Sequence, residues 1–360
     1  MKTKLAIDSR MLSWTGAGAY LRNLLKFINY DIVLGDPALL PNSTVIPFTS
    51  PIYGIKEQIF FPYRALRKAK TGVLHIPHCN IPLLYCRKLV VTIHDLTHLI
   101  YPKFQPHKKY NRISRLVYLY FYFMNWFACK RASRIITVSK NTKEDIIKFF
   151  KIKPEKISVI YHGVGEEFII REKSEAEYLY KKYLIPRDKK ILLYVGNLTP
   201  HKNVEKLICS FAKIEDRDNC CLVLAGKSFD QFSGNQKAKE LGIEKGVFQI
   251  GYISQEELVD FYNLADLFVF PSIYEGFGLP ILEAFACGTS VACSHTSSLS
   301  EVGGEFAFYF NPLDENDMAK QIGKALNSKQ EPKKLRNYAL QFSWKKTAEQ
   351  TLNVLNSVLV

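Results

Sequence analysis

The chain has 360 residues, 47% hydrophobic and 23% charged, a composition typical of a folded globular protein rather than a disordered one. One hydrophobic core rarely supports this length, so two domains are expected. No apolar run approaches the roughly 18 residues of a membrane span, and Asp8 interrupts the first apolar residues too early for a signal peptide. The eight cysteines form no C-x-x-C pair and no cluster with metal-ligand spacing, which indicates a reduced, cytoplasmic protein.

The net charge of +15 is distributed unevenly along the chain. Of the 49 Lys+Arg and 34 Asp+Glu residues, positions 1–165 contain 26 and 8, which gives this half +18 and leaves −3 for the remainder. A basic first half indicates a polyanionic partner, which could be nucleic acid, phospholipid headgroups or a phosphorylated substrate.

Short apolar segments alternate with longer amphipathic ones along the whole chain. Helical patterns, such as 19–28 and 140–151, lie between the apolar segments. Strands rich in Val, Ile and Leu that alternate with helices are typical of parallel sheets covered on both faces. The sequence therefore predicts an α/β fold with two doubly wound, Rossmann-like domains. Strands are predicted at 4–8, 44–48, 72–76, 89–95, 134–139 and 157–163 in the first series, and at 190–196, 220–226, 247–252, 266–271 and 289–294 in the second.

The two series place the domains at 1–168 and 169–343, and the amphipathic helix predicted at 344–360 is expected to pack back on the first domain. Ligands of open α/β sheets bind at the carboxyl ends of the strands, beside helix N-termini. Two domains that face each other through these edges would form a cleft. The loops that follow the strands are therefore the places to look for function.

The first such loop is "TGAGAY" (15–20), which leads into a helix. Gly16 and Gly18 permit close approach of the backbone, and the helix N-terminus offers N–H groups to an anion. Turn chemistry alone would also explain two glycines at this spacing. A dinucleotide-dependent dehydrogenase is not favoured, because Leu21 stands where a third glycine is expected.

The loop "YVGNLTPHKN" (194–203) also follows a strand and opens a helix. His201 and Lys202 stand at the start of this helix, where a positive charge is unfavourable for the helix itself. Their position makes sense if an anion such as a diphosphate binds there, although a solvated loop lysine is the simpler alternative. In "VVTIHDL" (90–96), His94 ends a buried strand, so it is either a structural histidine or a substrate contact.

The loop "SIYEGFGLPILEAFACG" (272–288) places Glu275 and Glu283 on either side of a glycine-rich bend. Pro280 suits the first position of a helix. Glu283 is then expected in about the first turn, where the macrodipole favours a negative charge. Taken alone, this is compatible with an ordinary strand-turn-helix junction in which Glu275 is solvated.

A metal site is not expected. The segment Asp216-Arg217-Asp218 has the D-x-D pattern with which some sugar-transfer enzymes hold a divalent ion. It follows a predicted helix and precedes a strand, which places it at the edge of the sheet opposite to the ligand edge. These side chains are therefore predicted to be solvated turn residues.

In order and spacing, these loops resemble those of the family 4 retaining glycosyltransferases, which have the GT-B fold. "EGFGLPILEA" is similar to the glutamate-x7-glutamate motif of that family, and "GNLTPHKN" is similar to its donor-diphosphate loop. The resemblance extends over essentially the whole chain, and the subtype is similar to bacterial mannosyl- and rhamnosyltransferases of surface polysaccharide assembly. Further segments that resemble family landmarks are "TGAGAY", "IHDLTH", "RIITVSKNTKEDI", "KISVIYHGV" and "SLSEVGG".

The resemblance implies that Glu275 contacts hydroxyl groups of the donor sugar and that Glu283 binds the ribose of the nucleotide. One departure is Asn197, which stands where many members have arginine, and His201 also replaces a commoner arginine. Lys202 would then be the only permanent cation on the diphosphate. The residues implied in catalysis are Glu275, His94, Lys202 and His201, and those implied in donor binding are Gly16, Gly18, Gly196, Asn197, Gly226, Lys227, Tyr252, Ile253, Gly276, Phe277, Gly278, Leu279 and Glu283.

The expected reaction is transfer of a hexose, with mannose or rhamnose favoured, from a GDP-, UDP- or dTDP-linked donor to a saccharide or lipid-linked acceptor. Negative charge would develop on the leaving diphosphate, where Lys202, His201 and the helix N-termini after Gly16 and Gly196 would stabilise it without a metal or other cofactor. Retention through attack on the leaving-group face is favoured, because no candidate nucleophile is evident. A GT-B sugar-nucleotide epimerase is the alternative. A nucleic-acid-binding protein is less favoured, since no known binding module is present.

Two segments of the basic half combine aromatic and basic side chains, at 56–70 and 107–127. Such combinations suit a lipid interface. The sequence therefore predicts peripheral attachment to the inner face of the plasma membrane, with the alternative that the run at 116–127 packs partly in the core.

Overall fold

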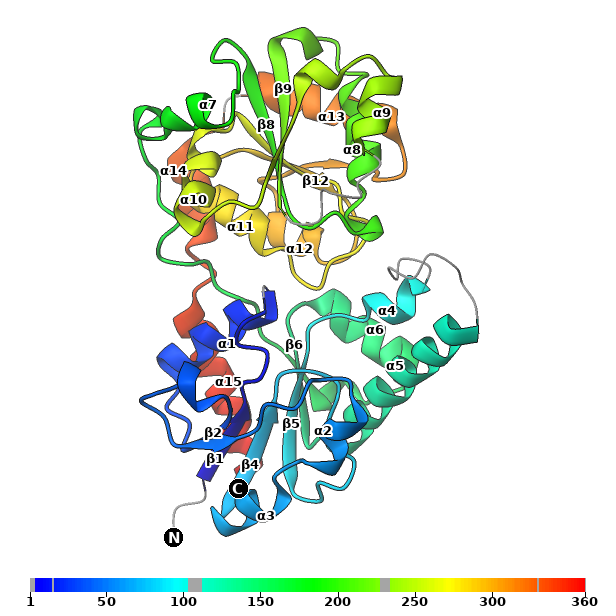
Figure 1. Ribbon diagram of the computed structural model, residues 1–360, viewed down its shortest axis with the longest axis vertical. Coiled ribbons are helices and arrows are strands. Elements are labelled where there is room, and N and C mark those ends of the chain that lie inside the picture. Colours follow the sequence, from blue (N-terminus) through cyan, green and yellow to red (C-terminus); the bar gives the residue numbers. More distant parts are fainter. Residues whose placement is uncertain (1–3, 15, 103–111, 227–233, 329, 360) are drawn as a thin grey trace. The chain divides into compact units, whose positions relative to one another are not determined.

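The computed structural model describes residues 4–14, 16–102, 112–226, 234–328 and 330–359, and it divides into two compact units (Figure 1). The first unit contains the described residues up to Gly163 together with those from Ser343 onward, and the second unit is Val164–Phe342. The first division thus falls five residues before the predicted boundary at 168. Helix α15 (Trp344–Leu359) belongs to the first unit, where it packs on α1 (Gly16–Phe27) and β4 (Thr71–Ile76).

The first unit is built on a seven-stranded parallel sheet with the order β3-β2-β1-β4-β5-β6-β7. The chain starts at the centre of the sheet, builds outward in one direction and then returns to build in the other, so the order reverses between β1 and β4. Helices α1 and α15 cover one face, and α3, α5 and α6 cover the other (Figure 1). The remaining elements are β1 (Lys4–Asp8), β2 (Ile32–Gly35), β3 (Val45–Pro47), α2 (Ile55–Ile59), α3 (Tyr63–Lys68), β5 (Lys88–Ile93), α4 (Thr97–Ile100), α5 (Arg112–Arg131), β6 (Arg134–Thr137), α6 (Lys140–Phe150) and β7 (Ile157–Val159).

The second unit repeats this plan with a six-stranded parallel sheet of order β10-β9-β8-β11-β12-β13. Helices α8 and α13 pack together, and α10, α11 and α14 form a second group of contacting helices. Its elements are α7 (Tyr178–Lys182), β8 (Lys190–Val195), α8 (Val204–Phe211), β9 (Cys220–Ala225), α9 (Gly234–Glu240), β10 (Val247–Gly251), α10 (Gln255–Leu264), β11 (Leu267–Phe270), α11 (Leu279–Ala286), β12 (Val291–Ser294), α12 (Leu299–Gly303), β13 (Phe308–Phe310), α13 (Glu315–Asn327) and α14 (Pro332–Ala339).

The predicted fold class is confirmed: both sheets are parallel, and their central strands are buried on both faces, as in β9, where every residue is buried. Each predicted strand is found, and two further strands, β2 and β13, were not predicted. Both are only three or four residues long, too short to show a periodicity of their own. Two predicted strands are shorter than expected, because β5 ends at Ile93 and β7 ends at Val159.

All eight cysteines are free thiols. Within the described part of the chain, no helix combines the length and the apolarity that crossing a membrane requires.

Candidate functional site

The carboxyl edge of the second unit's sheet is shaped by glycines that end three neighbouring strands. The N–H of Gly196 donates to the carbonyl of Ala225 at 2.9 Å, and the N–H of Gly226 donates to that of Gly251 at 2.8 Å. Gly196 and Gly226 have φ values of +154° and +151°, and a Cβ added to Gly226 would overlap the carbonyl oxygen of Gly196. The ends of β8, β9 and β10 therefore approach through bare backbone, which only glycine permits at Gly226.

The loop after β8 is fastened to the ends of two other strands. Asn203 adopts the left-handed conformation that asparagine tolerates, with φ +59°. Its side-chain amide donates to the carbonyls of Pro271 at 3.2 Å and Pro312 at 2.7 Å, and the N–H of Ile273 donates to the carbonyl of His201 at 2.8 Å. The loops after β8 and β11 are thereby held side by side.

This fastening brings together two of the predicted catalytic residues. The Nζ of Lys202 lies 2.5 Å from Oε1 of Glu275, and their side chains are only 19% and 15% exposed. The same ammonium group lies 5.4 Å from the ring centre of Phe270, a cation–π contact that adds to its stabilisation. Lys202, which is expected to bind the diphosphate, is thus paired with Glu275, which is expected to bind the sugar. The sequence did not predict this contact.

Two serines fix the backbone of the bend that carries Glu275. The N–H of Glu275 donates to the hydroxyl of Ser297 at 3.0 Å. The hydroxyl of Ser298, which is fully buried, lies within donating distance of the carbonyls of Glu275 and Phe277, at 2.9 and 2.7 Å. Neither serine was among the predicted site residues, although Ser298 is the first residue of the "SLSEVGG" segment that resembles a family landmark, and Ser297 directly precedes it.

Gly278 forms the entry to α11, with φ +119°, and an added Cβ would lie 3.0 Å from Cδ2 of Leu299. The helix begins at Leu279, so Pro280 is its second residue rather than its first. The N–H groups of a first helical turn have no acceptor within the helix, so the segment from Gly276 to Leu279 presents backbone donors suited to an anion or to sugar oxygens.

Glu283 is the fifth residue of α11, so the expectation that it stands in about the first turn is wrong, and the macrodipole does not explain it. The hydroxyl of Tyr262 donates to Oε2 of Glu283 at 3.0 Å. Burial of the carboxylate raises the pKa of Glu283 to about 7, with a smaller contribution from Glu167, while the Tyr262 hydrogen bond opposes the rise. A withdrawn carboxylate that titrates near neutrality is unusual for a purely structural residue.

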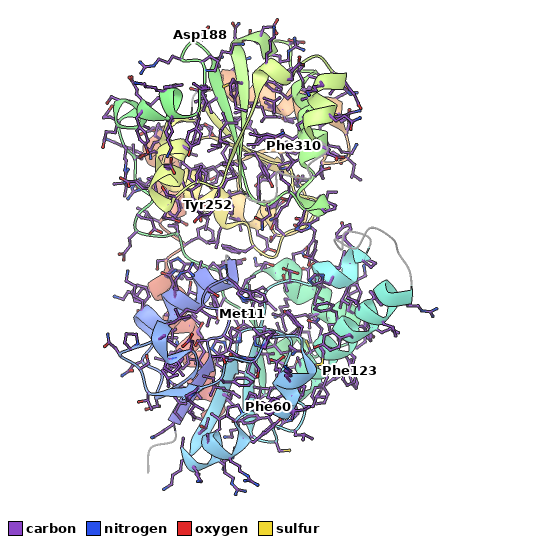
Figure 2. All side chains as sticks on the ribbon, in the orientation of Figure 1. Met11, Phe60, Phe123, Asp188, Tyr252 and Phe310 are labelled. Carbon is purple, nitrogen blue, oxygen red and sulfur yellow. The ribbon has the colours of Figure 1, made fainter. Side chains whose placement is uncertain are left out.

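Two other predicted donor residues follow β10. Tyr252 is 71% exposed (Figure 2), whereas Ile253 is buried beneath the start of α10. Lys227 lies outside the described residues. The D-x-D segment lies in a polar turn at the amino end of β9, where Asp218 pairs with its neighbour Arg217.

In the first unit, the two glycines of "TGAGAY" differ in their surroundings. A Cβ added to Gly18 would lie 2.8 Å from the carbonyl oxygen of Leu12 and 3.0 Å from that of Met11, whereas Gly16 faces open space. Close packing of α1 on the preceding turn therefore explains Gly18 without a ligand, and Gly16 leaves room at the start of the helix.

His94 directly follows β5 and is half-buried, with its ring edge-on to Tyr20 at 5.1 Å and to His162 at 5.6 Å. Burial lowers the pKa of His94 to about 4, although Asp95 and a hydrogen bond with the backbone of Pro77 act in the opposite direction. The ring is therefore neutral at physiological pH. Its Nε2 is buried and has no hydrogen-bond partner among the described residues.

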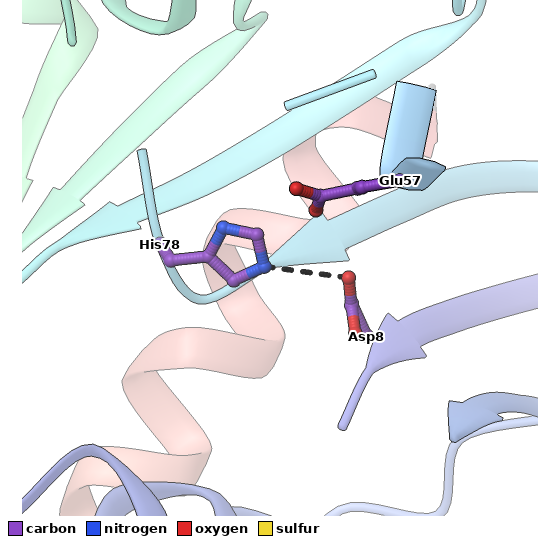
Figure 3. Close-up of side chains that lie close together, drawn as sticks. All are labelled: Asp8, Glu57 and His78. Atoms are coloured by element: carbon purple, nitrogen blue, oxygen red, sulfur yellow. Dashed lines mark hydrogen bonds and ion pairs between the residues drawn. The ribbon is translucent and has the colours of Figure 1, made fainter. Parts of the chain in front are cut away.

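A charged cluster that was not predicted lies at the same edge, between β1 and β4 (Figure 3). Oxygen and nitrogen atoms of Asp8, Glu57 and His78 lie within 4.8 Å of one another, a donor set that a divalent ion could use. The guanidinium of Arg10 already bridges the two carboxylates, with Nη2 at 2.5 Å from each. Burial would raise the pKa of Asp8, but Arg10 and His78 together hold it well below its usual range. The positive charge that this cluster requires is thus supplied by the chain itself.

The position of this cluster could have been found from the sequence, because Asp8 ends a predicted strand and His78 follows another. Like His94, these two residues lie at the carboxyl ends of strands, where ligands of parallel sheets bind. Glu57 could not have been found in this way, because it lies in the short helix α2 and not directly after a strand.

Comparison with known proteins identifies the family. A model described as "Glycosyl transferases group 1" matches residues 176–342, and one described as "Glycosyltransferase Family 4" matches residues 33–168. O-antigen chain mannosyltransferase B of Escherichia coli is 30% identical over 296 residues, which cover 80% of this chain and 75% of the relative. The chain belongs to glycosyltransferase family 4. It is therefore an enzyme that moves a sugar from a nucleotide-sugar donor to a saccharide acceptor, and the epimerase alternative is not favoured.

Other relatives and solved structures agree with this assignment. O-antigen chain mannosyltransferase RfbU of Salmonella typhimurium is 32% identical over 68% of this chain and 62% of the relative. The serotype-specific mannosyltransferase WbdA of Escherichia coli is 30% identical over 79% of this chain, which spans only 35% of that larger protein. Sucrose-phosphate synthase from Thermosynechococcus elongatus has a similar structure, with a TM-score of 0.78, 20% identity and 99% coverage of both chains. Anabaena HepE in complex with UDP and glucose reaches a TM-score of 0.76 with 19% identity, over 99% of this chain and 100% of that chain. These neighbours have the GT-B fold, as expected from the sequence.

Proposed function

We propose that this glycosyltransferase transfers a mannose-type hexose, with retention of configuration, from a nucleotide sugar to a saccharide or lipid-linked saccharide. The second unit would bind the donor and the first unit the acceptor. The observation that carries the proposal is the ion pair between Lys202 and Glu275, which places a cation for phosphate beside a carboxylate for sugar hydroxyls. The choice of mannose rests on the relatives, whose names identify them as mannosyltransferases.

The leaving diphosphate needs stabilisation as negative charge develops on it in the transition state. Lys202 is suited to this role because its ammonium is a mobile point charge held by one carboxylate oxygen, so a diphosphate can compete for it. His201, in the same turn, and the helix N-terminus after Gly196 would add further donors. A divalent ion is not required in this proposal.

Glu275 would then be available to accept hydrogen bonds from hydroxyl groups of the donor sugar. The bend fixed by Ser297 and Ser298 keeps the backbone of this carboxylate in place, so little ordering is needed when the donor binds. Glu283 would bind the ribose, for which its ionised form is the better acceptor. The neutral ring of His94 would accept a hydrogen bond from a substrate hydroxyl through Nε2.

We also propose peripheral attachment of the first unit to an anionic membrane. Four apolar residues of α5 are exposed although they are large: Leu116 (66%), Leu119 (51%), Phe123 (45%) and Trp126 (38%). Their spacing of three or four places them on one face of the helix, whose opposite face packs in the core. The run at 116–127 thus divides between core and surface, and we name its exposed members the α5 stripe.

Other exposed basic and apolar residues of the first unit support a lipid partner. Ile59 and Phe60, at the end of α2, are 66% and 64% exposed, and α3 and the residues after it carry exposed cations. Figure 2 labels Phe60. Large exposed apolar groups among cations favour an interface with anionic headgroups over a second copy of this equally basic unit. The cations are Arg64, Arg67, Lys68 and Lys70.

The decisive experiment measures nucleotide release from a panel of donors. Purified protein is incubated with GDP-mannose, UDP-glucose and dTDP-rhamnose, with and without a mannose disaccharide, and both nucleotide and saccharide products are quantified. We expect GDP release that increases with the disaccharide and a trisaccharide product with a retained anomeric configuration. Turnover restricted to another donor would contradict the mannose assignment, and an altered sugar still attached to its nucleotide would indicate epimerisation.

A further inference from the structure

We propose that a row of aromatic side chains in the first unit is the platform on which the acceptor saccharide packs. This inference rests on the proposed function, since it assumes a saccharide acceptor. The row consists of Trp14, Tyr53, Phe121 and His98, with ring centres 6.4, 5.3 and 4.4 Å apart in that order. We refer to it as the aromatic row.

The aromatic row lies at the carboxyl edge of the first sheet, where ligands of such sheets bind. Trp14 precedes α1 in the connection from β1, and Tyr53 precedes α2 in the connection from β3. His98 stands in α4, four residues after His94. The row therefore begins beside the glycine loop and ends beside the histidine that offers an unpaired nitrogen.

Three of its four rings are exposed, whereas Phe121 is half-buried and packs against the core of the first unit. Trp14 is 43% exposed and Tyr53 is 37% exposed, His98 is exposed, and Tyr120 beside the row is 36% exposed. Isolated exposed aromatic residues are ordinary, but contiguous ones of this kind mark a binding surface.

The row is also held rigidly. Tyr53 has φ +69°, a conformation that is strained for a tyrosine, and its N–H donates to Oε2 of Glu57 at 3.1 Å. The hydroxyl of Tyr120 donates to Oδ1 of Asn80 at 2.5 Å. Phe121 stacks on His98 with an interplanar angle of 17°. A strained residue that its surroundings keep in place favours a function for that position.

The chemistry of the row fits a sugar better than a base or a lipid chain. A pyranose has faces of C–H groups, which pack on aromatic rings, and a rim of hydroxyl groups, which need polar partners. Trp14 and Tyr53 are tilted by 47°, and Tyr53 and Phe121 by 60°, so only the Phe121–His98 pair is flat and the row as a whole is not a planar stack. Asp95, His98 and the Tyr120 hydroxyl interrupt the apolar surface that a lipid chain would require.

The first test separates acceptor from donor kinetics. For Trp14→Ala and Tyr53→Ala, with mannobiose as the acceptor, we expect the acceptor KM to rise about tenfold or more. The donor KM and the slow hydrolysis of GDP-mannose without acceptor should stay unchanged, because donor binding is assigned to the second unit. Phe27→Ala is the matched control, since Phe27 is an exposed aromatic at the other end of α1.

Tyr53→Phe and Trp14→Phe keep a ring at each position, so they should restore most of the acceptor affinity if ring packing is responsible. An unchanged acceptor KM in folded Trp14→Ala and Tyr53→Ala proteins would overturn the proposal. A simultaneous rise of the donor KM would also overturn it, because that result indicates a general distortion.

The second test needs no turnover and is independent of the proposed transfer reaction. Mannobiose is titrated into wild type while the tryptophan emission is followed, and Trp14→Phe and Tyr53→Ala are measured in parallel. We expect a saturable change in wild type that disappears in Trp14→Phe and weakens in Tyr53→Ala. A change that persists in Trp14→Phe, or no saturable change in wild type, would overturn the assignment. Loss of GDP-mannose turnover together with intact mannobiose binding would instead contradict the proposed donor.

Discussion

Each of the two sheets carries a carboxylate and a basic side chain at its carboxyl edge, yet the two pairs are built differently. In the first unit, Arg10 uses Nε and Nη2 on Asp8, Nη2 again on Glu57 and Nη1 on the carbonyl of Ser50, and all three charged side chains are at most 5% exposed. In the second unit, Lys202 meets one oxygen of Glu275, and both side chains keep access to water.

The difference separates a structural role from a functional one. A guanidinium has a fixed fork of donors, and that of Arg10 is engaged with three partners inside the protein and stacked 4.2 Å above Phe48. A ligand would have to break this closed arrangement. An ammonium is a mobile point charge, so Lys202 can transfer from a carboxylate to a diphosphate without moving the backbone. We therefore infer that the first pair maintains the fold and that the second pair exchanges partners with the donor.

The largest expected effect breaks the first pair. Arg10→Met leaves two buried carboxylates without their cation, which costs about 3–5 kcal/mol of unfolding free energy. Lys202→Met should cost less, because Glu275 keeps partial access to water whereas Asp8 and Glu57 do not. Chemical denaturation of both variants measures this contrast. Equal losses of stability in the two variants would remove the distinction between a closed and an exchangeable pair.

Replacing the carboxylate of the second pair should affect activity rather than stability. In Glu275→Ala we expect kcat to fall at least about a hundredfold, comparable to the removal of an important transition-state contact. Its melting temperature should match that of wild type, because the residue is partly exposed in a loop. Glu240→Ala, at the exposed end of α9, is the control. If Glu275→Ala turns over at the wild-type rate, the assignment of Glu275 to the donor sugar is wrong.

Glu283→Ala is expected to weaken binding of the nucleoside diphosphate by about 1.5–3 kcal/mol, which is roughly 10–150-fold in Kd. Since the pKa of Glu283 in the ligand-free protein is raised to about 7, affinity should decline as the pH falls through 7 and the carboxyl becomes protonated. Calorimetric titration between pH 5.5 and 8.5 measures this dependence. Glu283→Gln should abolish the pH dependence in this range.

The same raised pKa predicts a change in stability. The carboxyl group of Glu283 stays protonated up to a higher pH in the folded protein than in the unfolded chain. Its contribution to the free energy of unfolding is therefore fully present below about pH 4.5 and is lost as the pH rises through 7. The free energy of unfolding, measured by denaturation at pH 5 and at pH 8, should therefore change less between the two pH values in Glu283→Gln than in wild type. An identical difference in the two proteins would show that another group causes it.

A weaker effect is expected at the proposed membrane surface of the first unit. Neutralising Arg64, Arg67, Lys68 and Lys70 together should release the protein from anionic vesicles, since each cation near such a surface contributes about 1 kcal/mol. Binding of wild type should decrease as salt screens the charges. Co-flotation with phosphatidylglycerol vesicles measures both effects. The matched control neutralises four exposed lysines of the second unit, namely Lys181, Lys239, Lys245 and Lys333.

The α5 stripe gives a separate test of the membrane proposal. Phe123→Ser with Trp126→Ser should reduce vesicle binding even at low salt, because the apolar contribution is lost while the charge is kept. If wild type ignores anionic vesicles at low salt, the membrane proposal is wrong, and the basic surface must serve a soluble anionic partner.

The comparison of the two pairs also shows what could be predicted from the sequence. The strands and the loops that follow them were predictable, because apolar runs and glycine-rich bends are local patterns. Lys202 and Glu275 were both identified, but their contact was not, since a local pattern gives no distance between residues 73 positions apart. Arg10 was missed because its role depends on Glu57, which comes from another segment of the chain.

The aromatic residues illustrate a second limit. In the run at 116–127 nearly every residue is apolar, so periodicity cannot tell which face is buried. The structure places Met124 in the core and leaves Phe123 exposed. The aromatic row draws its four rings from four separate segments, so no sequence pattern announces it.

The smallest expected effect, and the one that tests both pairs at once, is the response to removal of metal ions. If Arg10 satisfies the first cluster and Lys202 serves the leaving group, transfer should continue at the wild-type rate in excess EDTA. Turnover of GDP-mannose, measured after dialysis against EDTA and again after addition of manganese or magnesium, checks this. In Arg10→Met the Asp8, Glu57 and His78 set is freed, so manganese should stabilise this variant against unfolding but leave wild type unaffected. Loss of wild-type activity in EDTA with recovery on adding metal would instead show that the diphosphate needs a divalent ion, and Lys202 would lose its proposed role as the main cation on the leaving group.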